Sequence, residues 1–268
     1  MANRFDWKPS ISVMLPDFCG ERMLDLRNNG IEFMELTGCR TDEFDGFDIR
    51  SKEIFKTASD FGVTIRSVHL PFYPTVDPAS EIEDRRRLFV DMQSELLKIC
   101  ADRGAQIAVV HPSSEPYTEE KRSVNLDFAI DSLGKINEVA RANGIKLAIE
   151  NLPRSCIARD CIEIRKIAKA LPDAYFCFDS NHSLIDSNLD IITAMGSRII
   201  TTHISDYEFI DEMHLFPGEG KCIWQDIMKK LEEVNYQGTW NYEIKDCSSI
   251  PAKKFKSNFE DLLSGRIL

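Results

Sequence analysis

The feature that most constrains the fold of this chain is a regular alternation of short strand-like segments with longer helix-like segments. The strand-like segments are rich in β-branched and aromatic residues, which is typical of buried parallel strands. They occupy residues 11–15, 31–36, 64–69, 107–111, 146–150, 174–179, 199–203 and 239–244. Apolar residues recur at helical spacing between them, as in residues 83–103,. The sequence therefore predicts about eight consecutive strand-helix units.

Glycine residues indicate where several of the predicted helices end. Each one closely precedes a predicted strand, and glycine is favoured just past a helix C-terminus because it adopts the left-handed conformation at little cost. These residues are Gly30, Gly62, Gly104, Gly144 and Gly238. The repeated order of helix, glycine and strand supports a parallel sheet, since no hairpin signal joins neighbouring strands.

A parallel sheet of this kind is either open or closed into a barrel. The first strand is not followed by a Gly-x-Gly-x-x-Gly pattern, and this weakens the open nucleotide-binding arrangements,. Eight units in 268 residues also match the usual size of a closed barrel,. We therefore predict an α/β fold, a (β/α)8 TIM barrel, with residues 1–268 forming a single domain.

Residues of metal-ligand type lie at the ends of seven consecutive predicted strands. They are Glu35, His69, His111, Glu150, Asp179, His203 and Glu243. The carboxyl ends of parallel strands meet at one rim, which carries the active site in barrel enzymes. A single buried carboxylate or imidazole is usually a satisfied structural group, but seven in phase are hard to explain separately. Glu35 is expected to face solvent or a neighbouring helix, and is left out of the metal set.

The remaining carboxylates and one imidazole predict a metal site. Glu150, Asp179, His203 and Glu243 would form a hard, mixed oxygen and nitrogen ligand set for one divalent ion, either Mn, Mg, Co or Zn. Such an ion stabilises the enediolate that forms when a proton leaves the carbon next to a carbonyl. Glu150 and Glu243 come from separate strands, so they could flank a sugar and act as base and conjugate acid.

Charge and composition narrow the range of partners. The formal net charge of −11 disfavours a nucleic acid or an anionic membrane as partner,. The eight cysteines form no Cys-x-x-Cys pair, and the chain contains neither a signal-peptide pattern nor a long apolar run,. We expect a cytoplasmic protein with no membrane association.

The chain resembles the xylose isomerase-like barrel superfamily, which includes sugar-phosphate isomerases and epimerases together with endonuclease IV. The most specific segment begins at His203, continues through His214-Leu-Phe-Pro-Gly-Glu-Gly and ends at Tyr242-Glu243. In the sugar enzymes, the residues matching the four predicted ligands bind one metal ion, and the two glutamates transfer the proton. The resemblance therefore implies an isomerase or epimerase of a small sugar, polyol or sugar phosphate. Relatives often form homo-oligomers.

The resemblance leaves alternatives open. The endonuclease branch is a phosphodiester hydrolase with three zinc ions, and four further histidines match its pattern, with Glu212 standing where that pattern has an aspartate. These histidines are His69, His111, His182 and His214. They could bind a second or third metal ion or contact the substrate, as some do in the sugar enzymes. The acidic balance disfavours DNA as substrate. A third alternative is a metal-binding barrel without catalytic activity.

Overall fold

The computed structural model describes residues 6–38, 41–114 and 116–267, and these contain one sheet of eight parallel strands. Its order is β7-β6-β5-β4-β3-β2-β1-β8. The strands are β1 (Pro9–Met14), β2 (Phe33–Thr37), β3 (Thr64–His69), β4 (Ile107–Val110), β5 (Lys146–Glu150), β6 (Tyr175–Asp179), β7 (Ile199–His203) and β8 (Trp240–Tyr242). A parallel bridge between Ile204 and Tyr242 joins β7 to β8. This bridge closes the sheet, so the predicted barrel is confirmed.

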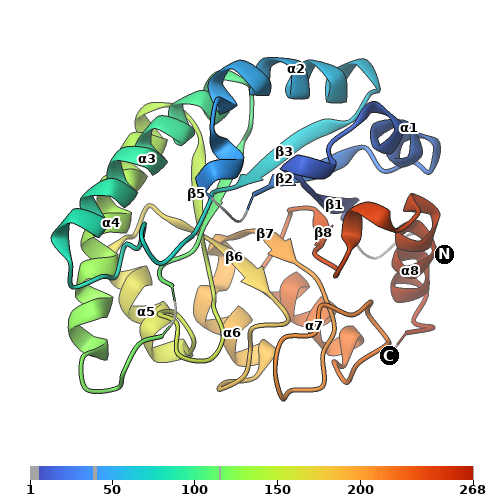
Figure 1. The fold of residues 1–268 in the computed structure, drawn as a ribbon. Coiled ribbons are helices and arrows are strands. Elements are labelled where there is room, and N and C mark those ends of the chain that lie inside the picture. The colour runs from blue at the N-terminus through green and yellow to red at the C-terminus, as the bar shows by residue number, and fades with distance from the viewer. Residues whose placement is uncertain (1–5, 39–40, 115, 268) are drawn as a thin grey trace.

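Within these described residues, eight α-helices surround the strands (Figure 1). They are α1 (Gly20–Asn28), α2 (Phe47–Asp60), α3 (Glu83–Asp102), α4 (Arg122–Ala142), α5 (Cys161–Ala170), α6 (Asn188–Met195), α7 (Trp224–Glu233) and α8 (Ala252–Leu263). Short 3-10 helices are η1 (Leu15–Asp17), η2 (Thr41–Phe44), η3 (Gly196–Arg198) and η4 (Cys247–Ser249). No helix in the described part of the chain is both long and apolar enough to cross a membrane.

Successive residues of each strand point alternately to the helices and to the barrel axis. Most outward residues are apolar and join the main hydrophobic core, as do Met34 and Leu36 of β2. Apolar inward residues form a small cluster on β4, β5 and β6, which includes Val109 and Cys177. The inward residues of β1 and β8 are polar instead, and the Ser10 hydroxyl donates to Asn241 Oδ1 at 2.7 Å. One side of the barrel interior is thus hydrogen-bonded rather than apolar.

Four of the five glycines predicted to follow helices have the expected left-handed conformation, with φ between 72° and 92°. Gly238 does not, so this prediction is wrong. Helix α7 ends at Glu233, and Asn235 takes the left-handed conformation with φ of 61°. Gly238 serves a different purpose, because a Cβ there would lie 2.3 Å from Tyr236 Oη and 2.5 Å from the Ile200 carbonyl oxygen.

The loop between β7 and α7 wraps around the buried carboxylate of Asp206. This carboxylate accepts hydrogen bonds from the backbone N–H groups of Gly218 and Cys222, at 2.8 and 3.0 Å, and from Trp224 Nε1 at 2.9 Å. Gly220 passes so close that a Cβ on it would lie 2.4 Å from Asp206 Oδ1. These contacts explain why the Pro-Gly-Glu-Gly segment contains glycines at 218 and 220. They also hold the loop that carries His214 against the barrel rim.

Candidate metal centre and cavity

Side chains from β5, β6, β7 and the end of β8 converge at the carboxyl-terminal rim of the barrel. His203 Nδ1 lies 3.2 Å from Glu150 Oε1, 3.2 Å from Glu243 Oε2 and 3.9 Å from Asp179 Oδ2. Potential ligand atoms of these four residues all lie within 4.8 Å of one another. Glu150, Asp179 and His203 are buried, whereas the Glu243 side chain is 24% exposed. The structure thus brings together the four residues predicted as metal ligands.

The chemistry of this cluster fits a divalent cation. Among the described residues, no group forms a hydrogen bond with Asp179 Oδ2 or with His203 Nδ1, although both atoms are fully buried. Buried polar atoms are rarely left without a partner, because the desolvation is then uncompensated. A cation among these atoms would supply the missing partner, and carboxylate oxygens with one imidazole nitrogen suit Mn, Mg, Co or Zn.

Without a cation, the three carboxylates repel one another, and the pKa of Asp179 is shifted in the opposite direction from those of Glu150 and Glu243. Burial and the neighbouring charges of Glu150 and Glu243 raise the pKa of Asp179 well above its ordinary value. Burial also acts to raise the pKa of Glu150, but the nearby His203 and His111 outweigh it and hold that pKa well below its ordinary value. The pKa of Glu243 is lowered as well, with His203 overcoming the effect of burial. The neighbouring imidazoles therefore stabilise the negative charge of this cluster.

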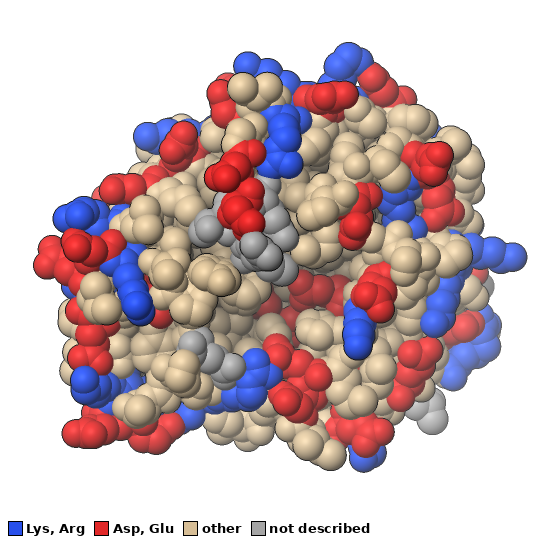
Figure 2. All heavy atoms as spheres, in the orientation of Figure 1, with Lys and Arg blue, Asp and Glu red and all other residues tan. Residues whose placement is uncertain are grey.

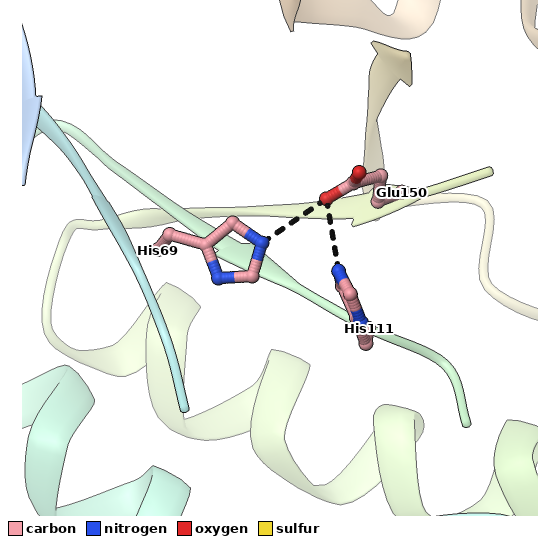
Figure 3. A group of neighbouring side chains, drawn as sticks. All are labelled: His69, His111 and Glu150. Carbon is pink, nitrogen blue, oxygen red and sulfur yellow. Dashed lines mark hydrogen bonds and ion pairs between the residues drawn. The ribbon is translucent and has the colours of Figure 1, made fainter. Parts of the chain in front are cut away.

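Glu150 also contacts two further histidines with its other carboxylate oxygen. His69 Nε2 lies 3.2 Å and His111 Nε2 3.4 Å from Glu150 Oε2, and both rings point towards it (Figure 3). Burial lowers the pKa of His111, whereas the contact with Glu150 overcomes burial and raises the pKa of His69. These three side chains are close enough to share an ion.

A third group borders the central cluster. His182 Nε2 is 2.7 Å from Glu212 Oε1, and His214 completes a set whose ligand atoms lie within 4.8 Å of one another. His182 Nδ1 faces inward, 3.3 Å from Glu150 Oε1. Asp179, Glu150 and Glu212 outweigh burial and raise the pKa of His182 well above its ordinary value. The histidines that the sequence singled out therefore all lie within or beside the central cluster.

The three groups open into a cavity of about 450 Å³. Phe72, Tyr73 and Leu152 contribute apolar wall, while Glu150, Glu243 and the four outer histidines contribute polar wall. Figure 2 shows acidic side chains in the hollow near the middle of this face. A volume of this size is sufficient for a small organic substrate.

The prediction for Glu35 is wrong. Its side chain is fully buried inside the barrel, with Oε1 2.9 Å from His203 Nε2. Strand β2 continues to Thr37, and its apolar residues Met34 and Leu36 face the helices. Because side chains alternate along a strand, Glu35 must face the axis. That alternation is visible in the sequence and could have identified it.

Sequence reasoning also missed Arg154. It lies in the loop after β5, lines the cavity, and forms ion pairs with Glu212 and, at 2.8 Å, with Asp211. Both acidic residues belong to the loop after β7, so the pairs connect two loops across the cavity mouth. No local sequence pattern marks residues that are paired over such a separation.

Glu212 is expected to stabilise the protein in a pH-dependent way. Burial raises its pKa, but the contacts with His182 and Arg154 outweigh burial and lower the pKa from 4.5 to about 2. A lowered carboxyl pKa stabilises the folded state above pH 4.5, and this stabilisation is lost as the pH falls towards 2,. In chelator-treated protein, Glu212→Gln should reduce the free energy of unfolding near neutral pH by up to about 3 kcal/mol. Urea titrations at several pH values should show this difference shrinking in acid, whereas a constant difference would contradict the assignment.

The comparisons with known proteins agree with the fold. The chain belongs to the xylose isomerase-like TIM barrel family, whose match covers residues 24–262. A curated relative, the uncharacterized protein MJ1311 of Methanocaldococcus jannaschii, is 26% identical over 210 residues, which cover 75% of this chain and 71% of that protein. A second, MJ1614 of the same organism, is 22% identical and covers 79% of this chain and 81% of its own.

Several solved structures are similar over almost the whole barrel. A D-tagatose 3-epimerase-like protein has a TM-score of 0.80 at 23% identity, covering 97% of this chain and 100% of its own. A D-psicose 3-epimerase determined in the presence of D-fructose has a TM-score of 0.77 at 18% identity, covering 96% of this chain and 97% of its own. A 3-keto-D-glucoside 4-epimerase from E. coli has a TM-score of 0.73 at 19% identity, covering 96% of this chain and 100% of its own. At these identities the similarity establishes the fold alone.

Proposed function

We propose that this protein is a metal-dependent isomerase or epimerase of a small sugar or polyol, acting by proton transfer next to a carbonyl. The observation that carries the proposal is a pair of glutamates, Glu150 and Glu243, that both approach His203 Nδ1 to 3.2 Å and both line the cavity. Moving a proton beside a carbonyl requires one group that removes it and another that returns it.

Glu150, Asp179, His203 and Glu243 would hold the ion. A divalent ion there would polarise the substrate carbonyl and offset the negative charge that develops as the proton leaves. Glu243, the more exposed glutamate, lies where it can reach a substrate carbon directly, and it acts first as the base. Glu150 is buried among histidines and returns the proton on the opposite side. Since both carboxyl pKa values are lowered, both groups start as bases. The proton that Glu150 returns therefore comes from His69 Nε2, which lies 3.2 Å from Glu150 Oε2, and Glu243 releases the proton that it removed to solvent.

The names of the similar structures support this class of reaction. Three of them are described as sugar epimerases or as a protein like one, and each shares the whole barrel with this chain. In the proposed enzyme, the outer histidines contact the substrate. The residues proposed for this role are His69, His111, His182 and His214.

The charges around the cavity favour a neutral substrate. Among the described residues that line it, Arg154 contributes the one guanidinium or ammonium group. Its ion pairs with Asp211 and Glu212 already balance that charge. A phosphate group would meet Glu150 and Glu243 without a cation of its own, which is unfavourable at short range. We therefore propose an unphosphorylated ketose or polyol.

The hydrolase alternative is favoured by a specific observation, which is the presence of two further groups that could each hold an ion. One comprises His69, His111 and Glu150, and the other comprises His182, Glu212 and His214. The acidic hollow in Figure 2 weighs against a polyanionic substrate,. The number of bound ions separates the two functions.

Metal analysis tests the proposal directly. We expect about one tightly bound ion per chain, as a single charge-stabilising centre requires. Asp179→Asn should abolish this ion, and the fold should persist because the amide oxygen can still accept the 2.6 Å hydrogen bond from the Asn181 N–H group. His214→Gln is the matched variant in the third group and should leave the ion count unchanged. Three tightly bound zinc ions, with one lost in His214→Gln, would favour the hydrolase instead.

Turnover is tested in a second experiment. The metal-loaded protein, incubated in deuterium oxide with a panel of neutral ketoses, should incorporate solvent deuterium into a converted sugar. Retention of one ion with no exchange in any sugar would favour the barrel without catalytic activity. Exchange that persists after complete removal of the ion would contradict the metal-dependent mechanism.

A further inference from the structure

A buried carboxylate lies directly beneath the candidate metal centre and is not used by the proposed reaction. Glu35 is fully buried at the barrel axis. Its Oε2 accepts a hydrogen bond from the Ser67 hydroxyl at 2.8 Å, and its Oε1 accepts one from the Ser12 hydroxyl at 3.1 Å. Residues from β1, β2 and β3 thus hold this carboxylate at one position.

The Ser12 hydroxyl, one of the two that bind Glu35, is itself held in place. Ser12 Oγ accepts a hydrogen bond from Asn241 Nδ2 at 2.9 Å, which orients its own proton towards Glu35. Asn241 Oδ1 in turn accepts from Ser10 at 2.7 Å. This network spans β8, β1 and β2, so the position of the carboxylate depends on the pairing of these three neighbouring strands.

A buried carboxylate is costly unless an opposite charge or strong donor compensates it. In the described part of the chain, Glu35 forms its ion pair with His203, and no lysine or arginine pairs with it. Two serine hydroxyls could have been satisfied by a neutral amide side chain at lower cost. A carboxyl group rather than an amide at this position is therefore explained best by the histidine that it faces.

The two ring nitrogens of His203 face different partners. Nε2 points down the barrel and is 2.9 Å from Glu35 Oε1, although the N–H direction is not aligned for a straight hydrogen bond. Nδ1 points up to the three carboxylates of the candidate centre. In metal sites, the second nitrogen of a ligating histidine is commonly held by a carboxylate, which fixes the ring and its proton.

We propose that Glu35 is a positioning residue that retains the proton on Nε2 of His203 and thereby directs an unprotonated Nδ1 to the metal ion. The proposal deepens the function proposed above and rests on it. It also explains why one side of the barrel interior is polar. Ser12, Ser67 and Asn241 hold Glu35 in place, and Glu35 in turn holds His203. Glu35 acts through His203 and does not line the cavity.

The test compares Glu35→Gln with Glu32→Gln. Glu32 is an exposed glutamate on the same segment, paired with Arg27 at 3.0 Å, so its substitution controls for loss of a charge. Apo-protein is titrated with Co²⁺ in the absence of any sugar. We expect Glu35→Gln to remain folded by circular dichroism, to bind Co²⁺ about 10- to 100-fold more weakly and to show an altered cobalt absorption spectrum. Glu32→Gln should match the wild type in both respects.

A purely structural role for Glu35 would lower the melting temperature but leave cobalt affinity and spectrum unchanged, and that result would overturn the proposal. Nitrogen-15 NMR of the ion-free protein gives an independent measurement. The Nε2–H resonance of His203, assigned by its loss in His203→Gln, should shift in Glu35→Gln and stay in place in Glu32→Gln. If the wild type bound no ion, the proposed function would fail, whereas an unmoved Nε2–H resonance would refute the role of Glu35.

Discussion

Glu243→Gln is expected to reduce solvent-deuterium exchange into the substrate by about 10²- to 10⁴-fold, the usual contribution of a positioned acid or base. The amide has nearly the shape of the carboxylate but cannot accept a proton. The fold should persist, because the backbone of Glu243 forms the structural contacts: its N–H group donates to Ile204 O at 3.1 Å, and its carbonyl faces His214 Nδ1 at 3.0 Å. Mass spectrometry of the recovered sugar measures the exchange.

The control for this substitution is Glu208→Gln. Glu208 lies on the loop after β7, is 44% exposed and pairs with Lys221 at 3.1 Å. Exchange should be unaffected there, since the residue does not line the cavity. Undiminished exchange in Glu243→Gln, at equal metal content, would show that another group moves the proton.

Gly220→Ala is expected to destabilise the protein by about 3 kcal/mol or more. The new Cβ would lie 2.4 Å from Asp206 Oδ1, 2.5 Å from the Tyr207 carbonyl oxygen and 2.6 Å from the Tyr207 nitrogen. Two of these are backbone atoms, and the Asp206 carboxylate is held by four donors, so none can move cheaply. Relief requires the loop to shift and to release Asp206, which leaves a buried charge without partners.

Gly134→Ala is the matched control. Gly134 lies inside α4, where a Cβ would make an ordinary contact of 3.4 Å with Leu171 Cδ2. Alanine in a helix interior should raise the free energy of unfolding by about 0.5–1 kcal/mol. Urea titrations of both variants measure the difference. Equal stability of Gly220→Ala and the wild type would show that the loop is not held as described.

The fold could be predicted from the sequence because its signals are local. Strand runs and helix-ending glycines recur along the chain, and predicted segments such as 64–69 and 146–150 coincide with β3 and β5. The last unit was predicted less accurately, since β8 is limited to Trp240–Tyr242 and Asn235, not Gly238, takes the left-handed conformation after α7. Gly238 is required by its approach to Ile200, a contact between distant residues that no local pattern reveals.

The convergence of Glu150, Asp179, His203 and Glu243 could also be anticipated, because strand ends share one rim. Their role as ligands remains a prediction. The residues around these four were harder to predict, because their contacts depend on the direction of each side chain and on ion pairs and hydrogen bonds between distant parts of the chain. Glu35 was predicted to face solvent or a helix, although its position between the core residues Met34 and Leu36 sets it on the inward face,.

The division between outward and inward strand residues has a consequence for how such a protein can change over evolutionary time. The outward row packs against the helices, so substitutions there disturb the whole core,. The inward row near the rim contacts mainly itself and the cavity, as the pairs of Ser12 with Glu35 and of Glu150 with His69 show. New substrate preferences can therefore arise by exchanging inward residues while the scaffold is inherited intact.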